Sequence, residues 1–135
     1  MADILLVYAS EEGQTRRIAE RMAELFRQGG HRSRVVDFRE LHELPEAVEA
    51  VIIGASVHIG HHSELLEAWV REHRERLTGI PAAFFSVSLS AGADRPGAAA
   101  EAREYVSDFL MRTGWQPSQS AAFAGALRYT RYGFF

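Results

Sequence analysis

The sequence predicts a single α/β domain in which helices cover a parallel sheet of five strands. Short apolar runs alternate with amphipathic stretches along the chain, which is typical of strands joined by right-handed helical crossovers. The length of 135 residues suits one domain, and the content of 47% apolar and 24% charged residues is typical of soluble globular proteins. No repeat, linker or low-complexity segment interrupts the chain, so we expect one domain over residues 1–135.

The first half of the chain predicts three strands and one helix. Residues 4–8 are a continuous apolar run, as expected for a strand buried on both faces of a parallel sheet. A helical stripe follows and stops at Gly29 and Gly30, which suit a helix C-terminus. The stripe consists of Ile18, Met22, Leu25 and Phe26. Residues 34–37 suit a short edge strand and residues 51–55 a buried one, with the least periodic stretch of the chain between them.

The second half alternates two helices with two strands. A second helical stripe starts after Ser63, a candidate N-cap. The other segments are a strand opened by Pro81, a third helix and a last strand, over residues 82–87, 102–110 and 121–124. Five aromatic side chains lie on the apolar stripes and are expected in the core rather than at a cofactor: Trp69, Phe84, Phe85, Phe109 and Trp115.

The end of the chain departs from the usual doubly wound pattern. Such a fold normally adds a helix after its fifth strand, whereas this chain continues for only about ten residues. We therefore expect the final helix to be missing through C-terminal truncation. Part of one sheet face would then lie bare, and an exposed apolar face needs a cover. A second copy of the chain in a homodimer, a membrane surface or the missing residues could provide it.

The composition excludes several kinds of chemistry. The absence of cysteine rules out disulfides, iron–sulfur clusters, thiolate metal sites and cysteine nucleophiles. All 15 basic residues are arginine, so the chain has no Schiff-base or P-loop lysine. A net charge of −3 gives no electrostatic case for nucleic acid as the main partner. With neither a targeting segment nor a membrane-spanning run in sight, we expect a cytoplasmic protein.

The loop after the first strand carries a pattern suited to a phosphate group. In open α/β sheets, ligands bind beyond the carboxyl ends of the strands. Ser10 and Thr15 place a hydroxyl at each end of this loop, Gly13 lets the backbone turn, and a helix N-terminus follows. The glycine pattern of dinucleotide sites and the P-loop sequence are both absent. The alternative is structural, in which Ser10 and Thr15 cap the helix and Gly13 makes a turn.

This loop resembles the phosphate-binding loop of flavodoxins, Ser/Thr-x-Thr-Gly-x-Thr, with Glu12 in place of the central threonine. Further segments make essentially the whole chain similar to one branch of that superfamily, the menaquinone-dependent protoporphyrinogen IX dehydrogenases, which are FMN enzymes of haem biosynthesis. The segments that carry this resemblance are residues 10–19, 51–56, 60–61, 85–87 and 125–132. The resemblance implies a flavodoxin-like doubly wound sheet with the strand order 2-1-3-4-5.

The resemblance also implies an FMN site made of three loops. The first loop would hold the phosphate through Ser10, Glu12, Gly13, Gln14 and Thr15. The second would lie along the flavin ring through Ser56, Val57, His58, Ile59 and Gly60, with His58 and Ile59 where related enzymes prefer a basic–aromatic pair. The third would close over the other side of the ring through Ser88, Leu89 and Ser90, unless it is a plain connection of small residues. Arg16 and Arg17 are expected to point to solvent.

The histidines of the second loop are open to several interpretations. His58, His61 and His62 could bind a metal ion, contact the flavin or the substrate, or lie in solvent. No cysteine or aspartate nearby completes a metal site, and we expect none. These three residues are candidates for an acid or base because imidazole titrates near neutral pH, but we assign no catalytic residue.

The function that the resemblance implies is an FMN-dependent dehydrogenase that oxidises protoporphyrinogen IX and passes the electrons to a quinone. The alternatives are an electron-transfer flavodoxin without its own substrate, and a domain that keeps the fold but has lost FMN. Residues 128–135 alternate arginine with aromatic side chains, which suits a peripheral contact with the inner face of the cell membrane. The alternative for this tail is a frayed terminus.

Overall fold

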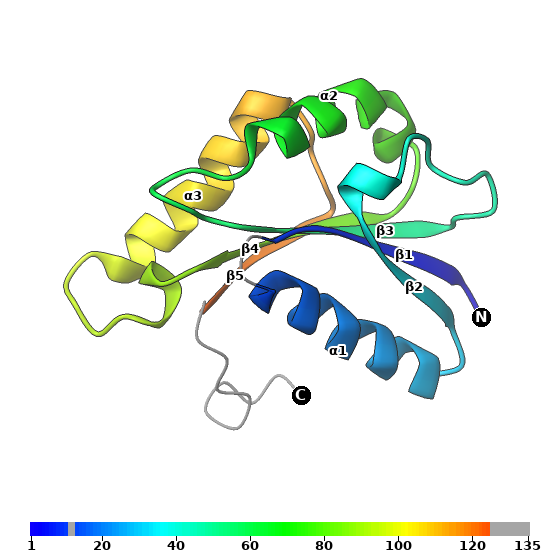
Figure 1. Ribbon diagram of the computed structural model, residues 1–135, viewed down its shortest axis with the longest axis horizontal. Helices are drawn as coiled ribbons and strands as arrows, with labels where there is room; N and C mark the ends of the chain where they lie inside the picture. The colour runs from blue at the N-terminus through cyan, green and yellow to red at the C-terminus, as the bar shows by residue number, and fades with distance from the viewer. Residues whose placement is uncertain (11–12, 125–135) are drawn as a thin grey trace.

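Five parallel strands form one sheet, as the apolar runs predict, and their order β2-β1-β3-β4-β5 is the one that the resemblance implies. The structure is a computed structural model, and it describes residues 1–10 and 13–124 (Figure 1). The strands are β1 (Asp3–Ala9), β2 (Arg32–Asp37), β3 (Ala50–Ser56), β4 (Ala82–Ser88) and β5 (Gln119–Ala124). The α-helices of the described residues are α1 (Gln14–Gln28), α2 (Glu64–Thr78) and α3 (Ala98–Thr113). Two short 3-10 turns, η1 (Phe38–Glu40) and η2 (Ser90–Gly92), follow β2 and β4.

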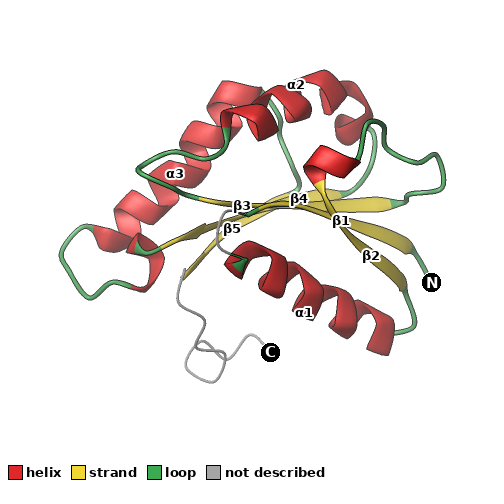
Figure 2. Ribbon diagram, in the orientation of Figure 1, coloured by secondary structure: helices red, strands yellow, loops and turns green. Residues whose placement is uncertain are grey.

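The helices lie on both sides of the sheet, with α1 on one face and α2 and α3 on the other (Figures 1 and 2). The larger core cluster fills the space under α2 and α3, and a smaller one lies under α1. All five aromatic residues that the sequence places in the core are buried. On the α1 face, Phe85 and Val87 of β4 are buried, whereas Ala121 of β5 is exposed and Phe123 is half-buried. The least covered part of this face is therefore at β5.

The predicted element boundaries hold to within a few residues. Ser63 caps α2, because its Oγ accepts a hydrogen bond from the Leu66 N–H at 3.2 Å. The third helix starts four residues before the predicted 102, at Ala98, because its alanine-rich first turn favours helix without adding a long apolar stripe. The expectations about a missing final helix and the tail fall on residues 125–135, which lie outside the described residues. Within the described ranges, none of the helices has the length and hydrophobicity needed to cross a membrane.

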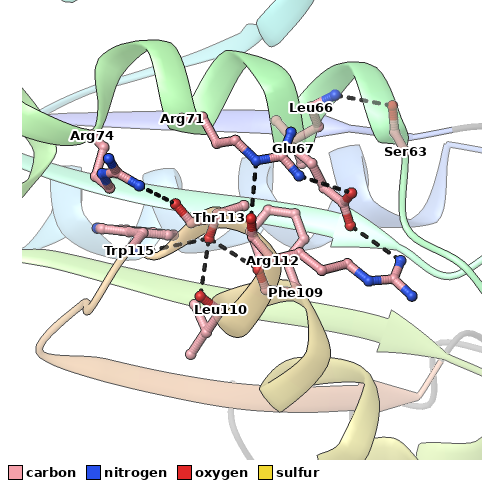
Figure 3. A network of polar contacts seen from close by, with 10 residues as sticks. All are labelled: Ser63, Leu66, Glu67, Arg71, Arg74, Phe109, Leu110, Arg112, Thr113 and Trp115. Atoms are coloured by element: carbon pink, nitrogen blue, oxygen red, sulfur yellow. Dashed lines mark hydrogen bonds and ion pairs between the residues drawn. The ribbon is translucent and has the colours of Figure 1, made fainter.

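Arginines of α2 hold the C-terminal end of α3 (Figure 3). The last carbonyls of a helix have no partner within it. Arg71 Nε donates to the carbonyl oxygen of Arg112 at 2.9 Å, and Arg74 Nη1 donates to that of Thr113 at 3.0 Å. The buried carboxylate of Glu67 lies 3.8 Å from the Arg71 guanidinium and 3.6 Å from that of Arg112. These contacts tie together α2 and α3, the two helices that cover the larger core.

Gly54 provides the space that one core aromatic ring occupies. A Cβ atom at this position of β3 would lie 2.1 Å from Cζ of Phe85 on the neighbouring strand, so no larger side chain fits without a shift. We expect Gly54→Ala to lower the free energy of unfolding by about 1–3 kcal/mol, the usual cost of overpacking a core. Urea unfolding of the variant measures this loss. Gly79→Ala is the matched control, because the nearest heavy atom there is 3.7 Å from the added Cβ. Equal stability of the two variants would contradict this packing.

Candidate functional site

The carboxyl ends of β1, β3 and β4 lie at one edge of the sheet, so the three predicted loops start from the same edge. The register sets Ala9 beside Ala55, and Ser56 beside Val87. Such an edge is where ligands bind in open α/β sheets. The prediction that these three loops share one edge is confirmed.

The first loop turns at Gly13 into α1. The Gly13 N–H donates to Ser10 Oγ at 2.9 Å, and Gly13 has φ +88°, a conformation that favours glycine. The predicted contribution of Glu12 lies outside the described residues, which omit 11 and 12. Ser10 therefore closes the loop from one side, and no hydrogen bond within the described residues uses its hydroxyl hydrogen.

The N-terminus of α1 is open to an anion. Among the described residues, no side chain caps this helix, and no acidic residue lies in its first turn, so its first N–H groups and the positive end of its dipole face out of the helix. Arg16 and Arg17 are exposed, as expected, and Arg16 pairs with Glu20 at 2.8 Å. Of the structural alternative, the turn at Gly13 and the hydrogen bond from its N–H to Ser10 are present, whereas the Thr15 side chain makes no cap hydrogen bond.

Two buried polar atoms of this loop lack a partner. Thr15 is 0% exposed, and its Oγ1 makes no hydrogen bond in the described structure. The Oε1 atom of Gln14 is also buried and makes no hydrogen bond there. A buried polar group without a partner costs about 1–3 kcal/mol. The Thr15 hydroxyl can donate to a phosphate oxygen, and the Gln14 amide can turn over to present its N–H groups. The residues of this loop thus fit a bound phosphate group.

The second loop is a tight turn with an apolar tip. His58 and His61 pair through backbone hydrogen bonds of 2.7 and 3.1 Å, which leaves Ile59 and Gly60 as the central residues. Both have positive φ, 51° for Ile59 and 77° for Gly60, and a β-branched residue rarely adopts this conformation. The Ile59 side chain is 84% exposed. The turn therefore projects an apolar side chain from the edge where the flavin is expected.

His62 is a core residue, so the interpretation as a solvated loop histidine is wrong for this position. Its side chain is 5% exposed, its Nε2 lies 2.8 Å from Ser86 Oγ, and its ring packs edge-on against Phe84 and Phe109. Burial lowers the pKa of His62 to about 4, and the charge of Arg112 acts in the same direction. The imidazole is therefore neutral at pH 7, and its contact with Ser86 ties the end of the second loop to β4. His58 and His61 are exposed, and the described residues hold no group of acidic or histidine side chains arranged for a metal ion.

The third loop is tied to α3. Ser88 Oγ accepts from the Ala91 N–H at 3.3 Å, and Ser90 Oγ donates to Glu101 Oε1 at 2.8 Å. Glu101 also accepts from Arg95 and from Tyr105, each at 2.9 Å. The hydrogen bonds from Ser90, Arg95 and Tyr105 lower the pKa of Glu101 to about 2. The Ser90 hydroxyl thus anchors the loop, whereas Leu89 is 80% exposed beside it.

A pocket of about 260 Å³ at this edge brings together residues from several loops. Ser10, Ser56 and His58 are predicted site residues among its lining. The other predicted site residues that the structure describes do not line it, namely Gly13, Gln14, Thr15, Val57, Ile59, Gly60, Ser88, Leu89 and Ser90. Its remaining lining consists of Ala9, Phe38, Arg39, His61, His62, Ser63 and Leu65. The sequence pattern did not indicate Phe38 and Arg39, although their position directly after β2 puts them at the same sheet edge.

Comparison with known proteins gives the class. The flavodoxin domain model matches residues 5–135, and the chain belongs to this family. The protoporphyrinogen IX dehydrogenase [quinone] of Escherichia coli K12 is 34% identical over 132 residues, which are 97% of this chain and 72% of that protein. The protein of the same name from Leishmania major is 36% identical over 134 residues, 97% of this chain and 57% of its own length.

Solved structures show the same fold. Oxidised flavodoxin 1 from Bacillus cereus superimposes with a TM-score of 0.64 at 18% identity, covering 94% of this chain and 87% of that one. An archaeal flavodoxin gives a TM-score of 0.62 at 17% identity, covering 92% and 85%. The flavodoxin domain and these structural neighbours point to FMN as the cofactor, in agreement with the phosphate-compatible first loop.

Proposed function

We propose that this protein is an FMN-dependent dehydrogenase that oxidises protoporphyrinogen IX and passes the electrons to a quinone. The observation that best supports FMN binding is the buried Thr15 hydroxyl, which has no partner among the described residues and lies at the uncapped N-terminus of α1. The reaction is supported by the 34% and 36% identity to protoporphyrinogen IX dehydrogenases along 97% of this chain. When bound, FMN supplies the chemistry of accepting a hydride equivalent from the substrate and returning electrons to an acceptor.

The residues of the three loops divide the work of holding the cofactor. Ser10, Gly13, Gln14 and Thr15, with Glu12, would hold the phosphate through hydroxyl, amide and backbone N–H groups. Ile59 and Leu89 are exposed apolar side chains at the tips of the second and third loops, and they would cover the flavin ring. Their neighbours Ser56, Val57, His58, Gly60, Ser88 and Ser90 shape these loops. The second loop is supported by neutral His62 and the third by Glu101.

We propose no acid or base among the described residues. His58 and His61 line the pocket but are exposed, and the Nε2 atom of His62 is engaged with Ser86. We further propose that the protein works in the cytoplasm. The peripheral membrane contact through residues 128–135 and a homodimer that covers the α1 face at β5 both stay predictions.

An anaerobic turnover assay tests the reaction. The chain is loaded with FMN, and protoporphyrinogen IX and the soluble naphthoquinone menadione are added while porphyrin fluorescence is followed. We expect porphyrin to form only with FMN-loaded protein and quinone together. Complete oxidation to the porphyrin removes six electrons, so three quinones should be consumed for each porphyrin. A flavin-loaded protein that gives no porphyrin above the FMN-free control would contradict the proposal and favour the electron-carrier alternative.

A further inference from the structure

A groove of about 1050 Å³ runs along α2 and opens beside the pocket. One wall is α2 and the other is the segment after β2, residues 38–44. Phe38, Arg39 and Leu65 line both the groove and the pocket, so the two spaces meet at these residues. The groove follows α2 to Gly79 and Ile80 beyond its end, and a helix of 15 residues is about 22 Å long. Its volume lies just above the usual range for small-molecule sites, about 300–1,000 Å³.

The walls of the groove are held together by donors on α2. Trp69 Nε1 donates to the Leu41 carbonyl at 2.7 Å, and the His73 ring nitrogens lie 2.7 Å from the carbonyl oxygens of Trp69 and His42. Arg76 donates to the carbonyls of residues 44, 45 and 46 at 3.2, 2.9 and 3.3 Å. The irregular segment after β2 is thereby fixed against the helix. The groove is a preformed feature of this structure.

The charges around the groove favour an uncharged ligand. Two guanidinium groups line it: Arg39 Nη2 lies 2.6 Å from the Asp37 carboxylate, whereas Arg76 donates to neutral carbonyls and keeps its positive charge. Three carboxylates, Glu43, Glu72 and Glu75, also line it and outnumber the charge of Arg76, so the lining disfavours a ligand that carries carboxylate groups. Its apolar lining consists of Phe38, Leu41, Leu44, Leu65, Trp69 and Ile80.

We propose that this groove binds the quinone acceptor. The inference rests on the proposed function and adds the place where the quinone lies. Leu65 is 70% exposed at the junction with the pocket, where a quinone ring would meet an apolar surface next to the flavin site. An apolar tail would follow the groove along α2. The quinone takes two electrons and two protons from the reduced cofactor and leaves as the hydroquinone, while the cofactor returns to its oxidised form. The porphyrinogen, which carries carboxylates, is disfavoured in the groove by the three glutamates.

Quenching of Trp69 emission by menadione tests the groove without FMN or porphyrinogen. Trp115→Phe leaves Trp69 as the one tryptophan of the chain, because the sequence holds two. We expect saturable quenching in this background. Ala68→Arg, which places a long charged side chain on an exposed position of the groove wall, should weaken menadione binding at least tenfold. Met111→Arg is the matched control, an exposed position on α3 outside the groove, and it should leave binding unchanged.

The two proposals can fail separately. Equal menadione affinity in Ala68→Arg and Met111→Arg, or no saturable quenching at all, would overturn the quinone groove even if FMN binds and porphyrin forms. A failure to bind FMN would overturn the proposed function, and the quenching result would not change. In FMN-loaded enzyme, Ala68→Arg should raise KM for menadione while KM for protoporphyrinogen IX and the FMN affinity stay as in the control. A rise in both KM values would contradict a groove used by the quinone alone.

Discussion

Replacing Thr15 by valine should stabilise the FMN-free protein against unfolding and lower its affinity for FMN. The Thr15 Oγ1 atom is buried without a partner, so an isosteric methyl group removes an unsatisfied polar atom. We expect the free energy of unfolding of the FMN-free chain to rise by roughly 1 kcal/mol. With FMN, the hydroxyl is expected to donate to the charged phosphate, a hydrogen bond of about 1.5–3 kcal/mol, so the affinity should fall roughly 10- to 100-fold.

Thr113→Val is the matched control for this prediction. Thr113 is equally buried, but its Oγ1 donates to the Phe109 carbonyl at 2.9 Å. Its replacement should lower the stability of the FMN-free chain by about 0.5–1.5 kcal/mol and leave the FMN affinity unchanged. Urea unfolding and a flavin titration measure both quantities for both variants. If Thr15→Val destabilised the chain as Thr113→Val does, and bound FMN like the wild type, the role assigned to the first loop would be wrong.

The second large effect is a loss of stability in acid that depends on His62. The pKa of His62 is about 4 in the folded protein against an ordinary value of 6.5. As the pH falls below 6.5, the unfolded chain takes up a proton at this residue while the folded chain does not, so stability is lost down to about pH 4. The full loss is about 3 kcal/mol, because one pKa unit is worth 1.36 kcal/mol. Among charged groups near the ring, Arg112 lowers the pKa and Asp108 opposes it.

Two substitutions separate the titration of His62 from its packing. His62→Phe keeps an aromatic ring beside Phe84 and Phe109, and His62→Gln keeps a polar group for Ser86. Neither side chain titrates, so both variants should lose about 3 kcal/mol less than the wild type between pH 7 and pH 4. Urea unfolding at a series of pH values gives these curves. Curves parallel to that of the wild type would contradict a neutral, buried His62.

The sheet and the location of the site follow from local features of the sequence. Apolar runs such as residues 4–8 and 51–55 are typical of strands buried on both faces of a sheet. Ser63 marks a helix start because its hydroxyl can cap the helix, and Gly29 marks a helix end because it has no side chain. Once the strands are parallel, their following loops meet at one edge. The predicted positions of the loops therefore needed no knowledge of side-chain contacts.

The contacts that shape the site join residues far apart in the chain, and the hydrophobic periodicity of the sequence does not predict such contacts. Trp69 reaches Leu41 across 28 positions, and His62 reaches Ser86 across 24. Whether a loop histidine is solvated or buried depends on whether the third helix offers it a space, which for His62 is formed by Phe109 and Tyr105. Likewise, serine is a residue type that often binds ligands, but the Ser90 hydroxyl donates its hydrogen bond to Glu101.

A titration of the purified chain with FMN tests the central claim most directly. Flavin fluorescence is followed as protein is added, with Thr113→Val measured beside the wild type. We expect quenching that saturates at one FMN for each chain in both proteins. No saturable quenching with folded protein would contradict it, because neither the dehydrogenase nor an electron-transfer flavodoxin can act without the cofactor.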